Sequence, residues 1–222
     1  MKTKIAILSL SLFYFVSSGF KTEPEKDLLN KSKPGNSKFE LARTSKSISI
    51  FTRWIPATET RQTRQLKAEF YLDCFVKDVV AVLEDESTYT CWMKAAKSYY
   101  RLKTVNENQW YSYVQFSIPW PLNNQDCILK YNILENPENG QVKISLKSEP
   151  SYMQTHKGVE RISHMEAMWI ITQIEPSKTH VEYLVYSKQE PKFPTWITDP
   201  LIQKNLLKTM DALRSVVINA NQ

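Results

Sequence analysis

The sequence contains little glycine, histidine or cysteine, and each shortage excludes a class of site. Only 4 glycines occur among 222 residues, and no two of them are close together, which excludes glycine-rich phosphate-binding loops. The 3 histidines stand far apart, and no cysteine pair has the spacing of metal ligands. No Gly-x-Ser-x-Gly element occurs, which excludes the nucleophile elbow of a hydrolase. We therefore expect neither a metal nor another cofactor.

The 3 cysteines are too few for a disulfide framework, and their odd number leaves at least one of them free. Free cysteine is commonly buried as a small apolar residue, and we expect this of Cys74, Cys91 and Cys127. A Cys74–Cys91 disulfide is the alternative in an oxidising compartment.

The excess of basic residues is mild. The formal net charge of +6 is spread along the chain, without an arginine-rich run or an RNA-binding signature. We therefore expect no nucleic-acid partner. Weak, transient attraction to an anionic membrane surface stays open. We expect the protein to be a monomer.

Residues 1–19 have the pattern of a secretory signal peptide. Lys2 and Lys4 form a basic start, Ile5–Val16 is apolar, and Ser17–Gly19 supplies small residues for cleavage. An uncleaved anchor is the alternative, although the apolar run is short for a membrane span. We expect export to the periplasm or out of the cell.

Residues 20–38 are polar, and their composition predicts a flexible linker. Residues 39–220 carry strand and helix patterns throughout and are expected to form one domain. Alternating apolar residues, or β-branched and aromatic content between turn residues, predict its strands. They are Phe39–Arg43, Ser47–Trp54, Gln65–Leu72, Lys97–Val105, Gln109–Ile118, Cys127–Leu134, Gln141–Leu146, Met165–Ile174 and Thr179–Tyr186.

Two short helical segments are expected between the third and fourth strands. An apolar stripe predicts a helix that Asp73 caps and that ends around Asp85. The segment Ser87–Met93 reads as a second, shorter helical turn. We expect Tyr89 and Trp92 within it to be buried.

The chain ends in a long amphipathic helix, with Thr198 or Asp199 as its cap and Pro200 in its first turn. Its apolar residues recur at three- and four-residue intervals: Leu201, Ile202, Leu206, Leu207, Met210, Leu213, Val216 and Val217. One broad face of the helix must be buried, and the sheet is the available surface. We therefore expect an α+β fold, in which a curved antiparallel sheet wraps around this helix. The space between them is a common place for an apolar ligand.

The segment Trp110–Tyr131, WYSYVQFSIPWPLNNQDCILKY, predicts a hairpin of two strands joined by a Pro-Trp-Pro corner and a polar turn. Trp110 and Val114 share one face of its first strand, and Tyr113 and Gln115 share the other. One face is apolar enough for a core, while the other carries hydroxyl and amide groups.

This hairpin and several other segments occur in a suggestive order: SISIFTRWIP, LKAEF, YTCWM, WYSYVQFSIPWPLNNQD, MWIITQIEPSKTHVEYLVY and FPTWI. The run resembles the steroidogenic-acute-regulatory-protein-related lipid-transfer (START) family, most of all its bacterial secreted branch. The resemblance covers roughly residues 39–218. It implies a helix-grip fold with a tunnel for a sterol, phospholipid or other hydrophobic molecule, which the protein would bind or carry.

The turn of the hairpin departs from the family pattern. The family usually has Arg immediately before its Asp, whereas Gln125 precedes Asp126 in this chain. We therefore expect no buried Arg–Asp pair at this corner. Arg161 matches a position where the family often has Arg, and it is expected to supply positive charge to the cavity instead.

The resemblance and the strand patterns together give a set of candidate pocket residues. They are Trp110, Tyr113, Gln115, Asp126, Tyr131, Arg161, Met165, Trp169, Tyr183, Leu206 and Met210. Trp110, Trp169 and Trp196 are expected mainly as core residues. The segment Pro150–Ser163 is expected to be a mobile loop that, with the start of the terminal helix, opens the cavity.

Two alternatives stay open. Related helix-grip proteins act as cyclases or aromatases, for which Tyr113, His164 and Asp126 are the candidate acid–base groups. A protein-interaction module is the other alternative, if Trp169 and Tyr183 fill the tunnel.

Overall fold

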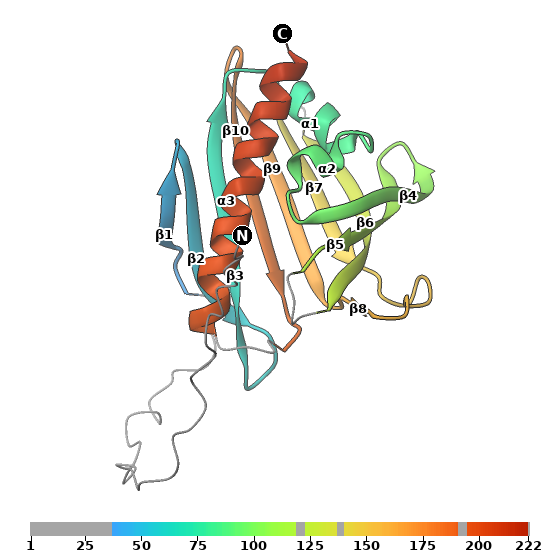
Figure 1. Cartoon of the computed structure of the whole chain (residues 1–222). Helices are drawn as coiled ribbons and strands as arrows, with labels where there is room; N and C mark the ends of the chain where they lie inside the picture. Colours follow the sequence, from blue (N-terminus) through green and yellow to red (C-terminus); the bar gives the residue numbers. More distant parts are fainter. Residues whose placement is uncertain (1–36, 119–122, 137–139, 191–194, 222) are drawn as a thin grey trace, which may run out of the picture. The chain divides into compact units, whose positions relative to one another are not determined.

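The computed structural model describes residues 37–118, 123–136, 140–190 and 195–221, which lie in one compact unit, Pro34–Gln222 (Figure 1). The predicted signal peptide and most of the predicted linker lie outside these residues, so both stay predictions. Within the described residues, no helix is long and apolar enough to cross a membrane.

The strands form one 10-stranded sheet with the order β1-β2-β3-β10-β9-β7-β6-β5-β4, and β8 pairs with β6 beside this path. Their bounds are Glu40–Ser45, Ile48–Pro56, Gln62–Leu72, Ala96–Asn106, Gln109–Phe116, Asn124–Asn136, Gln141–Ser148, Val159–Arg161, Met165–Glu175 and Lys178–Ser187 for β1 to β10. Neighbours along the path are antiparallel, whereas β8 runs parallel to β6. All the predicted strands are present, and β8 is additional.

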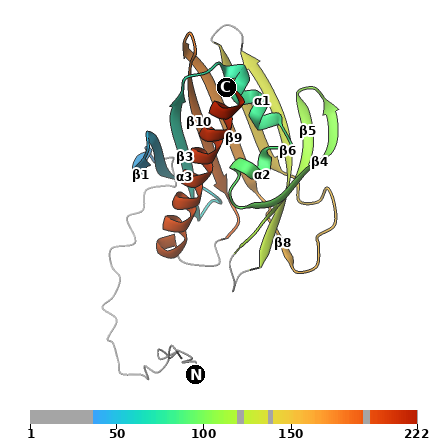
Figure 2. The same cartoon turned by 45° about the horizontal axis from the view of Figure 1, so that its top comes forward.

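The helices lie on one side of the curved sheet (Figures 1 and 2). They are α1, Val76–Glu84, α2, Tyr89–Trp92, and the long C-terminal α3, Thr195–Ala220. The helix α3 packs on β1, β2 and β3 and also contacts α1 and α2. This arrangement confirms the predicted α+β helix-grip fold.

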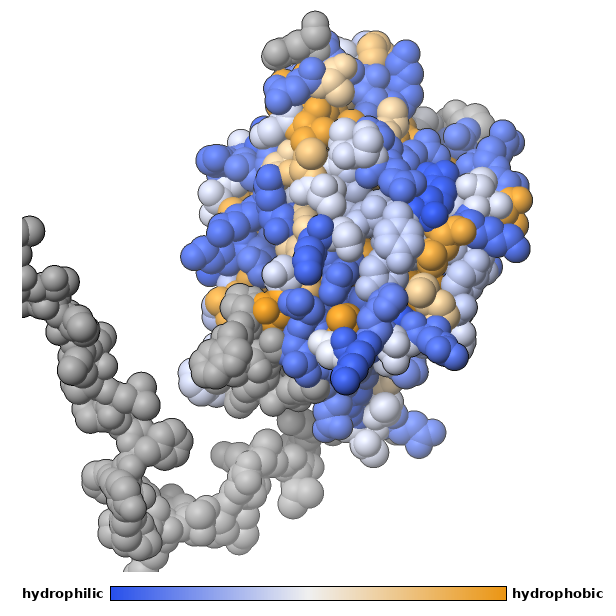
Figure 3. All heavy atoms as spheres, turned by 45° about the vertical axis from the view of Figure 1, so that its right-hand side comes forward, coloured by the Kyte–Doolittle hydropathy of each residue, from blue (hydrophilic) through white to orange (hydrophobic). Residues whose placement is uncertain are grey.

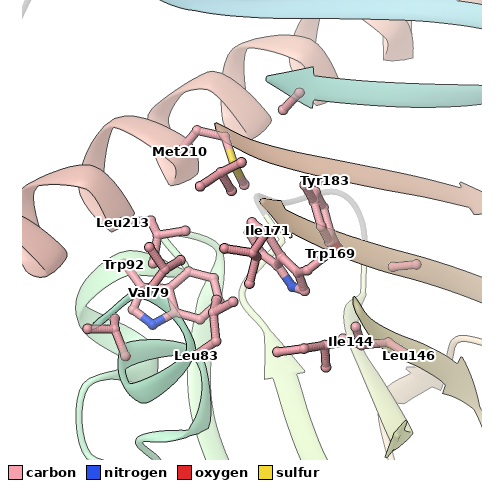
Figure 4. Close-up of a cluster of buried hydrophobic side chains, with 14 of the residues drawn as sticks. Val79, Leu83, Trp92, Ile144, Leu146, Trp169, Ile171, Tyr183, Met210 and Leu213 are labelled. Atoms are coloured by element: carbon pink, nitrogen blue, oxygen red, sulfur yellow. The ribbon is translucent and has the colours of Figure 1, made fainter. Parts of the chain in front are cut away.

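The face of the sheet toward α3 is apolar because every second residue of each strand points to it. Ala68, Tyr183, Trp169 and Ile144 are successive cross-strand neighbours on β3, β10, β9 and β7. Figure 4 shows this region, where side chains of the three helices meet those of the sheet. Burial of this inner face is the main stabilising contribution to the fold.

The opposite, outer face of the sheet carries polar residues and ion pairs. Lys67 of β3, for example, contacts the carboxylates of Glu69 and Glu182 at 2.6 and 3.4 Å. On the side of the molecule shown in Figure 3, hydrophobic residues are scattered among more numerous hydrophilic ones. The alternation predicted along the strands therefore separates an apolar inner face from a polar outer face.

The start of α3 differs from the prediction. The helix begins at Thr195, before the predicted caps Thr198 and Asp199, and Pro200 lies inside it. Pro200 has no N–H to donate to the carbonyl one turn earlier, so this part of the helix lacks one hydrogen bond. Trp196, expected in the core, is 77% exposed.

The start of α1 also differs. Phe75 stands at the N-cap, where Asp73 was expected, and the carboxylate of Asp78 accepts the N–H of Phe75 at 2.9 Å. An acidic residue three positions into the helix thus satisfies a free N–H from inside the first turn.

Candidate functional site

A cavity of about 230 Å³ lies between the inner face of the sheet and α3. Among the strands, α3 packs on β1, β2 and β3, while the central strands line this space together with the three helices. Its described wall consists of Leu83, Tyr89, Trp92, Met93, Ala95, Phe116, Leu129, Tyr131, Ile144, Leu146, Met165, Trp169, Tyr183, Val185, Ile202, Asn205, Leu206 and Thr209.

The wall is largely apolar, and its polar groups are neutral. Burial raises the pKa of Tyr89 and Tyr131 well above the ordinary value of tyrosine, and it also raises the pKa of Tyr183. All three hydroxyl groups therefore keep their protons at neutral pH.

Five of the predicted pocket residues line this cavity: Tyr131, Met165, Trp169, Tyr183 and Leu206. They come from β6, β9, β10 and α3, so the fold brings together residues far apart in the sequence. Their contact with a ligand stays a prediction.

Two further candidates, Trp110 and Met210, are buried on the inner side but do not line the cavity. Trp110 stacks on Tyr131 with ring centroids 4.7 Å apart, and the guanidinium of Arg101 lies 4.5 Å from its ring. Met210 belongs to the cluster drawn in Figure 4. Trp110 therefore supports the wall residue Tyr131, and Met210 belongs to the hydrophobic core.

The prediction that Tyr113, Gln115 and Asp126 line the pocket is wrong. Gln115 pairs with Asp126 across β5 and β6, one residue away from the inner-face pair Val114 and Cys127. Since neighbouring residues of a strand point to opposite faces, these three side chains lie on the outer face. Tyr113 is nevertheless buried there, and burial together with the nearby Asp126 carboxylate raises its pKa to about 12.

The expectation that no buried Arg–Asp pair forms at this corner is also wrong. Arg161 Nε donates to Asp126 Oδ1 at 2.6 Å, and its Nη2 donates to Oδ2 at 3.1 Å. The two side chains are only 6% and 0% exposed. The pair forms because β8 runs alongside the start of β6, which sets Arg161 opposite Asp126. It lies on the outer face and gives no charge to the cavity.

Arg161 also holds the segment Pro150–Ser163 in place. This segment is the predicted mobile loop that would open the cavity. Arg161 also donates to the backbone carbonyls of Pro150, Met153 and Gln154. In addition, Tyr152 stacks on Tyr111 of β5. This segment covers the outer face of β5 and β6, so the prediction that it closes the cavity is wrong.

The candidate acid–base groups do not meet at the cavity. Tyr113 and Asp126 lie on the outer face, and His164 is exposed in the turn before β9. In the part of the chain that the structure describes, no group of three or more His, Cys, Asp or Glu could hold a metal ion.

The three cysteines are free, so the alternative Cys74–Cys91 disulfide is not formed. Cys74 and Cys127 are buried as predicted, whereas Cys91 is exposed. Burial is the largest cause that raises the pKa of Cys74 to about 11 and that of Cys127 to about 12. Both thiols therefore stay protonated and unreactive at neutral pH.

Several wall residues were missing from the predicted set. Tyr89 and Trp92 were expected to be buried, but nothing in the sequence put them beside β6 and β9. Asn205 and Thr209 are one helical turn apart on the same face as Leu206. The helical period places both residues on that face, but a polar side chain gives no signal of burial in the sequence.

Comparison with known proteins places this geometry among described folds. No family model matches the sequence. An uncharacterized protein of Pseudomonas aeruginosa is 23% identical over 180 residues, which are 80% of this chain and 85% of that protein.

Solved structures show the similarity of fold more fully. A STAR-related lipid transfer protein of Xanthomonas axonopodis is 23% identical, with a TM-score of 0.71 over 81% of this chain and 98% of that one. Human StAR-related lipid transfer protein 5 is 12% identical, with a TM-score of 0.70 over 83% and 88%. The Zhui aromatase/cyclase of Streptomyces sp. R1128 is 10% identical, with a TM-score of 0.53 over 72% and 96%.

Proposed function

We propose, on the premise that this chain has the START fold, that it binds a hydrophobic small molecule or lipid between the sheet and α3. The observation that carries the proposal is the apolar cavity of about 230 Å³ in that position. Burial of apolar ligand surface is favourable by about 25 cal/mol per Å² before the costs of association. Transfer of the bound molecule would be a further step of the same function.

A larger lipid requires the cavity to widen, because pockets for drug-sized ligands usually measure roughly 300–1,000 Å³. Ile202, Asn205 and Leu206 of α3 line the cavity, and the first two of them are also exposed to solvent. We therefore assign the opening to the first turns of α3, where Pro200 already removes a helical hydrogen bond.

The proposal is tested by native extraction of the purified protein, with mass spectrometry of the molecules that co-purify. A neutral fluorescent probe, N-phenylnaphthylamine, gives an independent titration of the cavity. We expect a retained hydrophobic molecule, and probe fluorescence that rises to saturation at one site per chain. If neither co-purified nor added hydrophobic molecules are retained and the probe does not bind, the proposed function is wrong.

We also propose that the start of α3 contacts the surface of an anionic bilayer. Trp196 and Leu201 are 77% and 59% exposed, beside the cavity residue Ile202. Arg64 pairs with Asp199 of this helix at 3.4 Å and lies over the ring of Trp54. Exposed tryptophan is suited to the headgroup region of a membrane, and the net charge of +6 favours an anionic one. The pattern of residues 1–19 supports action in the periplasm or outside the cell.

Replacement of Trp196 with serine should weaken sedimentation with phosphatidylglycerol vesicles about tenfold. Burial of about 60 Å² of ring surface is worth about 1.5 kcal/mol, which corresponds to that factor. Tyr71→Ser on the outer face of β3 is the matched control and should leave sedimentation unchanged. If the Trp196→Ser variant and the parent sediment equally with the vesicles, the proposed contact between the start of α3 and the bilayer is wrong.

This geometry favours neither of the two alternatives. The interaction module needs Trp169 and Tyr183 to fill the tunnel, but both residues line an open space of about 230 Å³. The cyclase needs an acid–base group at the cavity, and Tyr113, Asp126 and His164 lie elsewhere. Ligand binding is therefore the function that this geometry supports best.

A further inference from the structure

The wall of the cavity contains no charged side chain among the described residues. None of the described residues that line it is Asp, Glu, Lys, Arg or His. The pair of Arg161 and Asp126 lies behind the sheet, where each charge is compensated by the other. An ionised group enclosed in this cavity would therefore find no partner, and burial of an unpaired charge is strongly unfavourable.

The tyrosines of the wall show how strongly their surroundings oppose charge. Burial is the largest cause that raises the pKa of Tyr89, Tyr131 and Tyr183. A carboxylate or phosphate oxygen placed beside them would meet the same penalty, because it too would lose its hydration.

Neutral hydrogen-bonding groups are present and free. The side chains of Thr209 and Tyr183 line the cavity, and these residues are only 5% and 7% exposed. In the described part of the chain, neither hydroxyl has a hydrogen-bond partner. Buried polar groups in folded proteins normally have one, so each of these hydroxyls is open to a ligand oxygen.

We infer that the ligand is an uncharged apolar molecule carrying a neutral oxygen, a hydroxyl or a carbonyl, which the hydroxyls of Thr209 and Tyr183 bind. This inference rests on the proposed binding function and narrows its ligand class. It selects neutral lipids, such as alcohols, sterols and esters, over fatty-acid anions and over phospholipids with an enclosed headgroup. The apolar wall supplies affinity, and the two hydroxyls supply orientation.

The test measures displacement of N-phenylnaphthylamine by dodecanol and by dodecanoate at neutral pH. Relative to partition into octanol, dodecanol should bind at least about tenfold more tightly than dodecanoate. Thr209→Val and Tyr183→Phe should each weaken dodecanol binding about twofold to tenfold, as expected for one neutral hydrogen bond. The affinity for the probe, which has no oxygen, is measured for each variant, and the affinity for dodecanol is expressed relative to it. Tyr71→Phe, on the exposed outer face, is the matched control and should change neither the affinity for dodecanol nor the affinity for the probe.

The outcomes separate the inference from the proposed function. Failure of the probe and of both competitors to bind would overturn the proposed function and the inference with it. If the probe binds but dodecanoate competes as well as dodecanol, only the inference is overturned. Unchanged dodecanol affinity in both variants would equally overturn it, because the hydroxyls would then make no bond to the ligand.

Discussion

Replacement of Arg161 with methionine should lower the free energy of unfolding by about 3–5 kcal/mol, because it leaves a buried carboxylate without a partner. Asp126 is fully buried, and Arg161 holds both of its oxygens. The substitution also frees the carbonyls of Pro150, Met153 and Gln154. Chemical denaturation followed by tryptophan fluorescence measures the loss.

A double replacement separates the unpaired charge from lost packing. Arg161→Met combined with Asp126→Leu should recover a large part of the stability, because no buried charge then remains. Lys178→Met breaks an exposed pair with Glu175 and should cost about 1 kcal/mol or less. A loss for Arg161→Met no larger than that of this control would contradict the assigned role of the buried pair.

Replacement of Leu146 with tryptophan should reduce the affinity for a hydrophobic probe more than tenfold while the fold is retained. Leu146 lines the cavity, and the larger ring would occupy space that a ligand needs. Overpacking of a filled core costs typically 1–3 kcal/mol, but an open cavity of about 230 Å³ takes up much of the added volume. Probe titration and thermal denaturation measure the two effects.

Lys147→Trp provides the matched control, because Lys147 is the next residue of β7 and lies opposite Lys130 on the outer face. Its variant should bind the probe like the parent. Unchanged probe affinity in Leu146→Trp, or equal losses in both variants, would mean that the probe binds somewhere else.

The fold could be predicted because periodicity reports burial directly. Period-two alternation such as that of Leu66, Ala68 and Phe70 marks a strand with one buried face, and all three residues are buried. The period of α3 identified Leu206, Met210 and Leu213 as its buried face in the same way. Because the strands were predicted to form one antiparallel sheet, the long C-terminal helix was the main element available to cover its apolar face.

The candidate site could be predicted only in part, because a pocket depends on which face of each strand turns inward. Tyr131 and Tyr183 were identified correctly as wall residues. Tyr113 is next to the inward-facing Val114 on β5, so its side chain lies on the outer face. The partner of Asp126 depends on β8, a strand of three residues that is too short for any periodic signal. The exposed start of α3 has the same apolar pattern as its buried part, so the pattern alone could not find where burial ends.

The position of the buried pair also has an evolutionary consequence. On β6, Asp126 forms the buried ion pair with Arg161 on the outer face of the sheet, whereas Leu129 and Tyr131 line the cavity on the inner face. Substitution of a residue in the cavity wall can therefore change the ligand without altering the Arg161–Asp126 pair that stabilises the outer face. The two faces of one strand can adapt separately, so new ligands can be acquired on a scaffold whose stability is secured elsewhere.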